Sequence, residues 1–140
     1  MKAFRTLFFA AALLSPNLLH AQMEDRPLMS VNIPFAFTVE NTRLPAGQYF
    51  VSMVEYNHFW EISTLDHKTN ALFHVLADQN SPAATGDSAL VFSHYPTDYV
   101  LTELRDHNRG IVAEVYPGKR GKQLAQRSSP QLTMIRAQAF

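Results

Sequence analysis

The sequence predicts an all-β protein, a single antiparallel β-sandwich or small closed β-barrel of roughly seven to nine strands. Residues 31–39 alternate between apolar and small or polar side chains, which directs one face to a core and the other to solvent. Strand-like segments of this kind recur about every ten residues, with turn-forming residues between them. The chain contains no cysteine, so packing has to stabilise the fold without disulfides.

The N-terminal residues 1–21 are typical of a secretory signal peptide. Two basic residues precede an unbroken apolar run at 7–14, which is far shorter than the roughly 20 residues of a membrane-spanning helix. Leu19, three residues before the expected cut, is larger than the small residue preferred there. We therefore expect a periplasmic or secreted protein with one domain over 22–140 and no transmembrane segment after cleavage. A buried N-terminal helix is the alternative interpretation.

The elements of that domain follow in order from residue 31. Pro34 lies inside the first expected strand, 31–39, and lacks a backbone N–H, so this strand is expected at a sheet edge or with a bulge. Residues 44–47 (Leu-Pro-Ala-Gly) predict a turn, and the polar residues 78–87 predict a long loop. The further strands are expected at residues 48–56, 59–65, 71–77, 88–95, 98–105 and 111–116.

The pattern changes in the C-terminal segment, residues 117–140. Residues 119–127 predict a short helix or an irregular strap, and 132–137 predict a closing strand. The basic residues of the segment are Lys119, Arg120, Lys122, Arg127 and Arg136, whereas all 12 acidic residues of the chain precede it. We expect the segment to fold back on the acidic body. A patch for a polyanion is the alternative, and the lack of interleaved aromatic residues gives no support for nucleic acid.

The histidines give little sign of a metal site. Those that follow the expected signal peptide are His58, His67, His74, His94 and His107, and their spacing matches no zinc motif. Both His67 and His107 follow an aspartate in an expected turn, so they would meet if their hairpins shared one end of the domain. Ordinary exposed turn histidines are the simpler interpretation. We expect no metal and no cofactor.

Nucleophilic catalysis has no supporting motif, since cysteine is absent and no serine lies in a Gly-x-Ser-x-Gly sequence. Three glutamates on expected strands, Glu61, Glu103 and Glu114, keep a hydrolase or isomerase open as an alternative, because paired carboxylates cleave glycosides. No catalytic residue is assigned.

Aromatic and polar side chains are densest between residues 90 and 101. One interpretation is that Tyr95 and Tyr99, together with Trp60, line a ligand cavity or a carbohydrate-stacking face. The candidate residues are Trp60, His94, Tyr95, Tyr99 and Glu103. The interpretation that we favour is that the tyrosines and the tryptophan pack at the margin of the core with their polar ends in water.

Several short motifs resemble a family of small exported β-rich proteins from soil bacteria. They are Ile-Pro-Phe-Ala-Phe-Thr-Val at 33–39, Leu-Pro-Ala-Gly-Gln-Tyr-Phe-Val at 44–51, Leu-Val-Phe at 90–92, His-Tyr at 94–95, Tyr-x-Leu-x-Glu at 99–103, Lys-Arg at 119–120 and Gln-Leu-Ala at 123–125. The resemblance covers most of residues 31–126. It implies the architecture and export, and it carries over no catalytic residue, ligand or partner.

The sequence thus favours an exported β-domain with a non-catalytic binding or structural role, its partner an envelope component or a small ligand. The alternatives are a small hydrolase or isomerase acting on carbohydrate or lipid, and a carrier that holds an apolar molecule inside a barrel.

Overall fold

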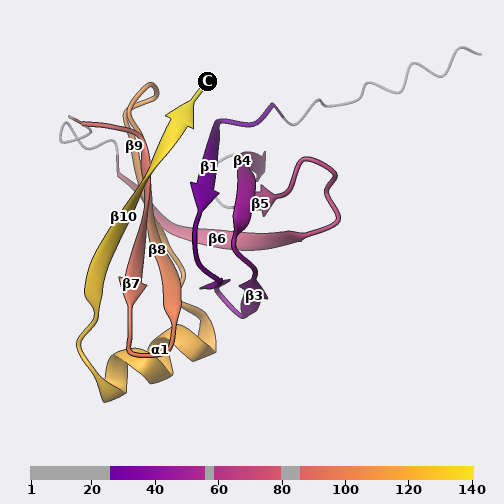
Figure 1. Ribbon diagram of the computed structural model, residues 1–140. Helices are drawn as coiled ribbons and strands as arrows, with labels where there is room; N and C mark the ends of the chain where they lie inside the picture. Colours follow the sequence, from indigo (N-terminus) through magenta and orange to yellow (C-terminus); the bar gives the residue numbers. More distant parts are fainter. Residues whose placement is uncertain (1–25, 56–58, 80–85) are drawn as a thin grey trace, which may run out of the picture.

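The computed structural model describes residues 26–55, 59–79 and 86–140, and within these ranges it contains ten strands and one helix (Figure 1). The strands are β1 (Met29–Ile33), β2 (Phe37–Val39), β3 (Thr42–Leu44), β4 (Gly47–Glu55), β5 (Phe59–Ser63), β6 (Asn70–Gln79), β7 (Ala89–His94), β8 (Tyr99–Asp106), β9 (Ile111–Val115) and β10 (Gln131–Ala139), and the helix is α1 (Gly118–Arg127). The expected signal peptide, His58 and residues 80–85 of the expected loop lie outside the described residues.

Eight of these strands close into an antiparallel barrel in the order β1-β4-β5-β6-β9-β8-β7-β10. Two meanders, β4-β5-β6 and β7-β8-β9, are joined on one side by β6 and β9 and on the other side by β1 and β10. The predicted fold class is confirmed, and it takes the form of a closed barrel rather than a sandwich.

The ring is closed by a short pairing between β1 and β10. This pairing comprises Met29 with Ala139, Ser30 with Gln138 and Val31 with Ala137, and it stops there. The rest of β10, from Gln131 to Arg136, pairs with β7 alone. Figure 1 shows β10 beside β1 at the end of the barrel away from α1, and the two strands diverging toward α1. We call the stretch along which β10 is no longer paired with β1 the seam.

The barrel interior is filled by large apolar side chains. Trp60, Tyr49 and Phe73 are almost completely inaccessible to water, and each such burial contributes about 1.5–3 kcal/mol. The Tyr49 hydroxyl donates a hydrogen bond to the carbonyl oxygen of Pro45 at 2.7 Å, so its polar end has a partner. Burial raises the pKa of this phenol above its usual value.

The prediction of a single strand over residues 31–39 is wrong, because the structure has two strands there, β1 and β2. Pro34 is exposed and ends β1, and the chain bends away from the barrel before β2 begins. The short β2 then runs parallel to β8, with Thr38 opposite Val100, and β3 pairs with β2 outside the ring. The proline therefore breaks the strand instead of marking an edge or a bulge within it.

The helix expected at 119–127 is confirmed as α1, and β10 extends the expected closing strand at both ends. Leu124 of α1 packs with Tyr95 and Val100 in a small cluster of its own. Gly121 allows this approach, since a Cβ there would meet the Pro117 Cβ at 3.0 Å and Val100 Cγ1 at 3.4 Å. In the part of the chain that the structure describes, no helix is long and apolar enough to cross a membrane.

The start of α1 is fixed by the turn between β2 and β3. Gly118 has φ +61°, and a Cβ on it would lie 2.3 Å from the carbonyl oxygen of Glu40. The Asn41 side-chain oxygen accepts a hydrogen bond from the Lys119 N–H at 2.9 Å, which satisfies one of the free donors at the helix N-terminus. The helix and the β2–β3 turn therefore hold each other in place.

We predict that Gly118→Ala lowers the free energy of unfolding by more than about 3 kcal/mol, through left-handed backbone strain and the collision with Glu40. The matched control is Gly110→Ala, where φ is +65° and a Cβ would meet nothing within 4 Å. The control should lose only about 1 kcal/mol. Urea unfolding of both variants measures the difference, and equal losses would contradict this account of the α1 start.

Candidate functional site

Three aromatic rings stack beside the seam. Phe35, from the bend between β1 and β2, lies 3.7 Å from the Tyr99 ring centroid with an interplanar angle of 12°. His94 lies 4.1 Å from the same ring at 2°. Because both rings are nearly parallel to Tyr99 at such short range, they occupy its opposite faces. Phe92 packs perpendicular to Phe35, with 5.2 Å between the ring centroids and an interplanar angle of 89°. The Phe35 end of the stack therefore joins the core, and His94 is the outer ring.

Strand register explains why these rings come together. His94 of β7 pairs with Tyr99 of β8 on one side and with Gln131 of β10 on the other. Directly opposed residues in a sheet share one face. Phe92, two residues before His94 on β7, points to the same face and lies opposite Thr133 of β10. We call Phe35, His94, Tyr99, Gln131 and Thr133 the seam site.

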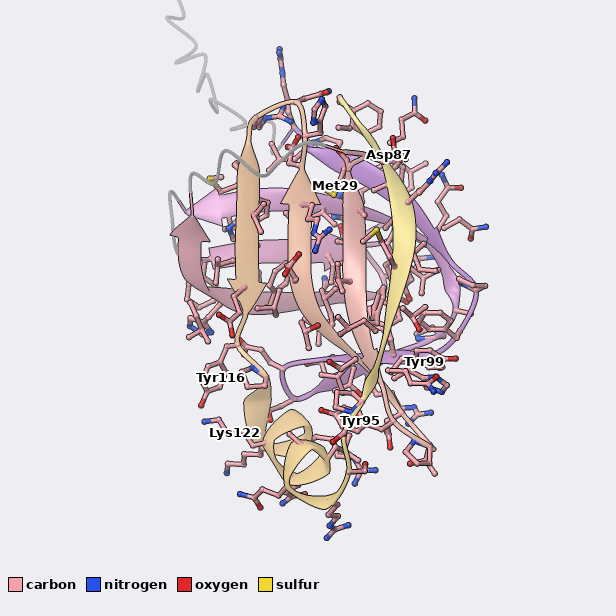
Figure 2. All side chains as sticks on the ribbon, turned by 90° about the vertical axis from the view of Figure 1, so that its left-hand side faces the viewer. Met29, Asp87, Tyr95, Tyr99, Tyr116 and Lys122 are labelled. Carbon is pink, nitrogen blue, oxygen red and sulfur yellow. The ribbon has the colours of Figure 1, made fainter. Side chains whose placement is uncertain are left out.

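The seam site is open to solvent although it continues the core face. Phe35, His94, Tyr99 and Thr133 are all half-buried, and Gln131 is exposed. The same face of β7 nearer the barrel centre carries Leu90 and Phe92, which are fully buried. The site is therefore the place where the apolar interior reaches the surface. Figure 2 shows Tyr99 at the α1 end of the barrel and Met29 and Asp87 at the opposite end.

The polar atoms of the stack are available to a ligand. Within the described residues, neither the His94 ring nitrogens nor the Tyr99 hydroxyl takes part in a hydrogen bond or an ion pair. The outer face of His94 is likewise not covered by another ring in these ranges. The arrangement offers a ring face beside several hydrogen-bonding groups, which suits a ligand that has both apolar and hydroxyl-bearing surfaces.

The structure brings together two of the five ligand-facing candidates, His94 and Tyr99. Trp60 faces the barrel interior and is only 2% exposed. Tyr95 is buried under α1 against Val100 and Leu124. Glu103 is half-buried and forms an ion pair with Arg105 on its own strand.

Three members of the site, Phe35, Gln131 and Thr133, were not predicted from the sequence. The alternation over 31–39 placed Phe35 on the core face of a continuous strand. In the structure β1 ends before Pro34, and Phe35 stacks on Tyr99 instead. The sequence signal for this position of Phe35 was Pro34, because a proline can end a strand. Gln131 and Thr133 reach the site only through the pairing of β10 with β7, which lies far away in sequence.

The glutamates considered for acid–base chemistry divide between two places. Glu103 of β8 and Glu114 of β9 are directly opposite each other, whereas Glu61 lies on β5 across the barrel. Glu114 is exposed, and Glu103 forms an ion pair with Arg105. The pair lies at neither of the two surface hollows described below nor at the seam site.

In each of the two Asp-His sequences, the aspartate bonds to residues of its own turn. Asp66 accepts hydrogen bonds from Thr64 and from the N–H of Lys68, and Asp106 pairs with Arg109 at 2.8 Å. His74 instead reaches another element, the β2–β3 turn, where its Nδ1 lies 2.8 Å from the Glu40 carboxylate. No group of three or more potential metal ligands occurs among the residues that the structure describes.

Among the residues that the structure describes, two hollows can be placed, and both lie away from the seam site. One, of about 310 Å³, is lined by Ser88, Asn108 and Ala137 at the barrel end opposite α1, and the Arg136–Asp87 ion pair (3.0 Å) borders it. The other, of about 110 Å³, lies between Phe50, Ser63 and Leu65. Neither gathers aromatic rings with free polar atoms as the seam site does.

Asp98 ties the basic C-terminal segment to the body. Its buried carboxylate accepts hydrogen bonds from Thr97 at 2.6 Å, Arg120 at 2.9 Å and Arg43 at 3.5 Å. These contacts, the Thr97 hydrogen bond first and then Arg120, hold the pKa of Asp98 below its usual value despite burial. A second ion pair joins Arg136 to Asp87. Two of the five basic residues of the segment, Arg120 and Arg136, therefore pair with acidic residues of the body, as expected.

We predict that Asp98→Asn lowers the free energy of unfolding by about 2 kcal/mol near neutral pH. Because the folded-state pKa is lower than the unfolded value of 3.8, the carboxylate stabilises the fold above about pH 4. That contribution disappears as the pH falls through the folded-state pKa. Urea unfolding at about pH 7 and about pH 3 should thus show a smaller difference between variant and wild type in acid. The same difference between variant and wild type at both pH values would contradict this role of the Asp98 carboxylate.

Comparison of the chain with models of known protein families, with curated proteins and with solved structures finds no match in any of the three. The resemblance to the exported β-rich family therefore stays a prediction.

Proposed function

We propose that this protein is an exported, non-catalytic binding protein whose seam site takes a carbohydrate of the cell envelope. The observation that carries the proposal is the half-exposed stack of Phe35, Tyr99 and His94, whose polar atoms have no partner among the described residues. Export is the part of the proposal supported by the leader-like residues 1–21.

A sugar ring fits this arrangement because one of its faces is apolar and its edge carries hydroxyl groups. The apolar face would lie on the outer face of His94 and extend the stack by one layer. The Gln131 amide, on the adjacent strand, and the Tyr99 hydroxyl would bond the sugar hydroxyls. Gln131 and Thr133 remain partly accessible on the same face for this purpose.

The packing of the barrel supports a site at the seam rather than in the interior. A side chain bordering a void that holds water exposes surface to that void. Many inward-facing side chains expose none: Met29, Ile33, Tyr49, Val51, Ile62, Phe73, Leu90, Phe92, Leu101, Leu104 and Ala113. No water-sized space borders these side chains, so an apolar molecule carried among them would have to displace them at considerable cost.

We predict that His94→Asn weakens binding of a soluble oligosaccharide by roughly fivefold in Kd, since the loss of one stacked ring is worth about 1 kcal/mol. Oligomers of N-acetylglucosamine and soluble peptidoglycan fragments are the probes. Nuclear magnetic resonance titration of the wild type should move the His94 and Tyr99 ring signals first.

The matched control is His67→Asn, an exposed histidine with φ +55° in the β5–β6 hairpin, a conformation that asparagine tolerates. Binding should be unchanged in this variant. If the wild type binds none of the probes, or if His94→Asn binds as well as His67→Asn, carbohydrate stacking at the seam site is wrong.

A further inference from the structure

The stretch of β10 beyond its pairing with β1 carries free backbone groups next to the seam site. Ala137 donates its N–H to the Ser88 carbonyl oxygen at 2.8 Å, toward β7. Because backbone groups alternate between the two sides of an antiparallel strand, those of Leu132 and Met134 point the other way. The pairing with β1 reaches only to Ala137 and the adjoining Arg136 carbonyl group. Among the described residues, the N–H and C=O of Leu132 and Met134 therefore have no partner.

Leu132 places one such donor and acceptor within the seam site. It lies between Gln131 and Thr133, whose side chains are on the same face as His94, whereas its own side chain is on the outer face and 73% exposed. The N–H and C=O of one residue in an antiparallel strand point to the same side and lie close together. At Leu132 they offer a ligand one fixed donor beside one fixed acceptor.

The open face of His94 is turned toward this edge of β10. Phe35, Tyr99 and His94 stack in that order, and the last two lie directly opposite each other on β8 and β7. The strands follow one another as β8, β7 and β10. The outer face of His94 therefore looks toward β10, whose backbone is about 4.8 Å from that of β7. A sugar ring on this face would lie over Gln131, with its far rim at the Leu132 backbone.

A neutral ligand that carries an acceptor beside a donor complements the Leu132 backbone. A carboxylate would accept from the N–H but repel the carbonyl oxygen, and an ammonium group would do the reverse. Residues 131–135 carry no charge that would hold either group. An amide carbonyl beside a hydroxyl satisfies both backbone groups, and an amide oxygen is the acceptor that a strand N–H finds in a sheet.

We propose that the sugar bound at the seam site is an N-acetylated hexosamine, an inference that rests on the proposed function. The carbonyl oxygen of its acetamido group accepts a hydrogen bond from the Leu132 N–H, and the hydroxyl on the neighbouring ring carbon donates to the Leu132 carbonyl oxygen. A sugar with a hydroxyl in place of the acetamido group is shorter there by the acetyl group. It leaves the Leu132 N–H without an acceptor, which costs binding free energy.

Isothermal titration calorimetry with two tetramers of the same linkage tests this preference, one of N-acetylglucosamine and one of glucose. Both present a ring face to His94, and the acetylated tetramer should bind about tenfold more tightly. Equal affinities would overturn the inference and leave the proposed function standing. The absence of any binding would overturn both.

Leu132→Pro removes the free N–H and none of the hydrogen bonds to β7, and proline is tolerated at such an edge position. The matched control is Leu132→Ala, which shortens the same exposed side chain and keeps the N–H. We expect the proline variant to lose the preference for the acetylated tetramer and the alanine variant to keep it. A preference that survives in Leu132→Pro would overturn the inference. Circular dichroism checks that both variants are folded.

Nuclear magnetic resonance gives a second readout on the wild type. The Leu132 amide signal should move when the acetylated tetramer binds and much less when the glucose tetramer binds. The Thr133 amide, which faces β7, is the internal control and should move little with either tetramer. A Leu132 amide that responds equally to the two tetramers would overturn its assignment to the acetamido group.

Discussion

The short pairing between β1 and β10 is the constraint on which the rest of the structure depends. It turns a long antiparallel sheet into a barrel by joining the first and last strands of the described chain. Since it involves only the residues from Met29 to Val31, closure is complete at one end of the barrel and incomplete at the other. The seam, with its aromatic stack and its free strand edge, follows directly from this incomplete closure.

The end of the barrel near α1 is completed by other means. The β2–β3 hairpin pairs with β8, receives the N-terminus of α1 through Asn41, and places Glu40 against His74 of β6. Arg120 of α1 reaches the buried Asp98, and Leu124 packs on Tyr95 and Val100. At this end of the barrel, β1 and β10 are not paired, and side-chain contacts between elements connect the structure instead. The helix precedes β10 directly and positions its start. This arrangement leaves Phe35, Tyr99 and His94 ordered but partly uncovered, as a preorganised binding surface requires.

Local sequence patterns predicted the architecture well and the candidate site only in part. Alternation, turn residues and the helix-forming run at 119–127 act over a few residues, so they indicate the strands and α1 without tertiary information. The strand break at Pro34 could not be predicted because a proline is compatible with a strand edge, a bulge or a strand end, and only packing decides among them. His94 and Tyr99 were found because they flank one tight turn between β7 and β8. Gln131 and Thr133 were missed because their position depends on which strands β10 joins. Trp60 was kept as a ligand-facing candidate beside the favoured packing at the core margin, because alternation does not say which face is the core.

The extent of the β1–β10 pairing is the most direct test of this account. Cross-strand nuclear Overhauser effects in the isotope-labelled protein report it residue by residue. We expect them to connect Ser30 with Gln138 and Val31 with Ala137, and to be absent between Ile33 and Ile135, the next residues that would face each other. A ladder that continues through Ile33 and Ile135 would contradict the open seam, and the absence of any contact between β1 and β10 would contradict the closed barrel.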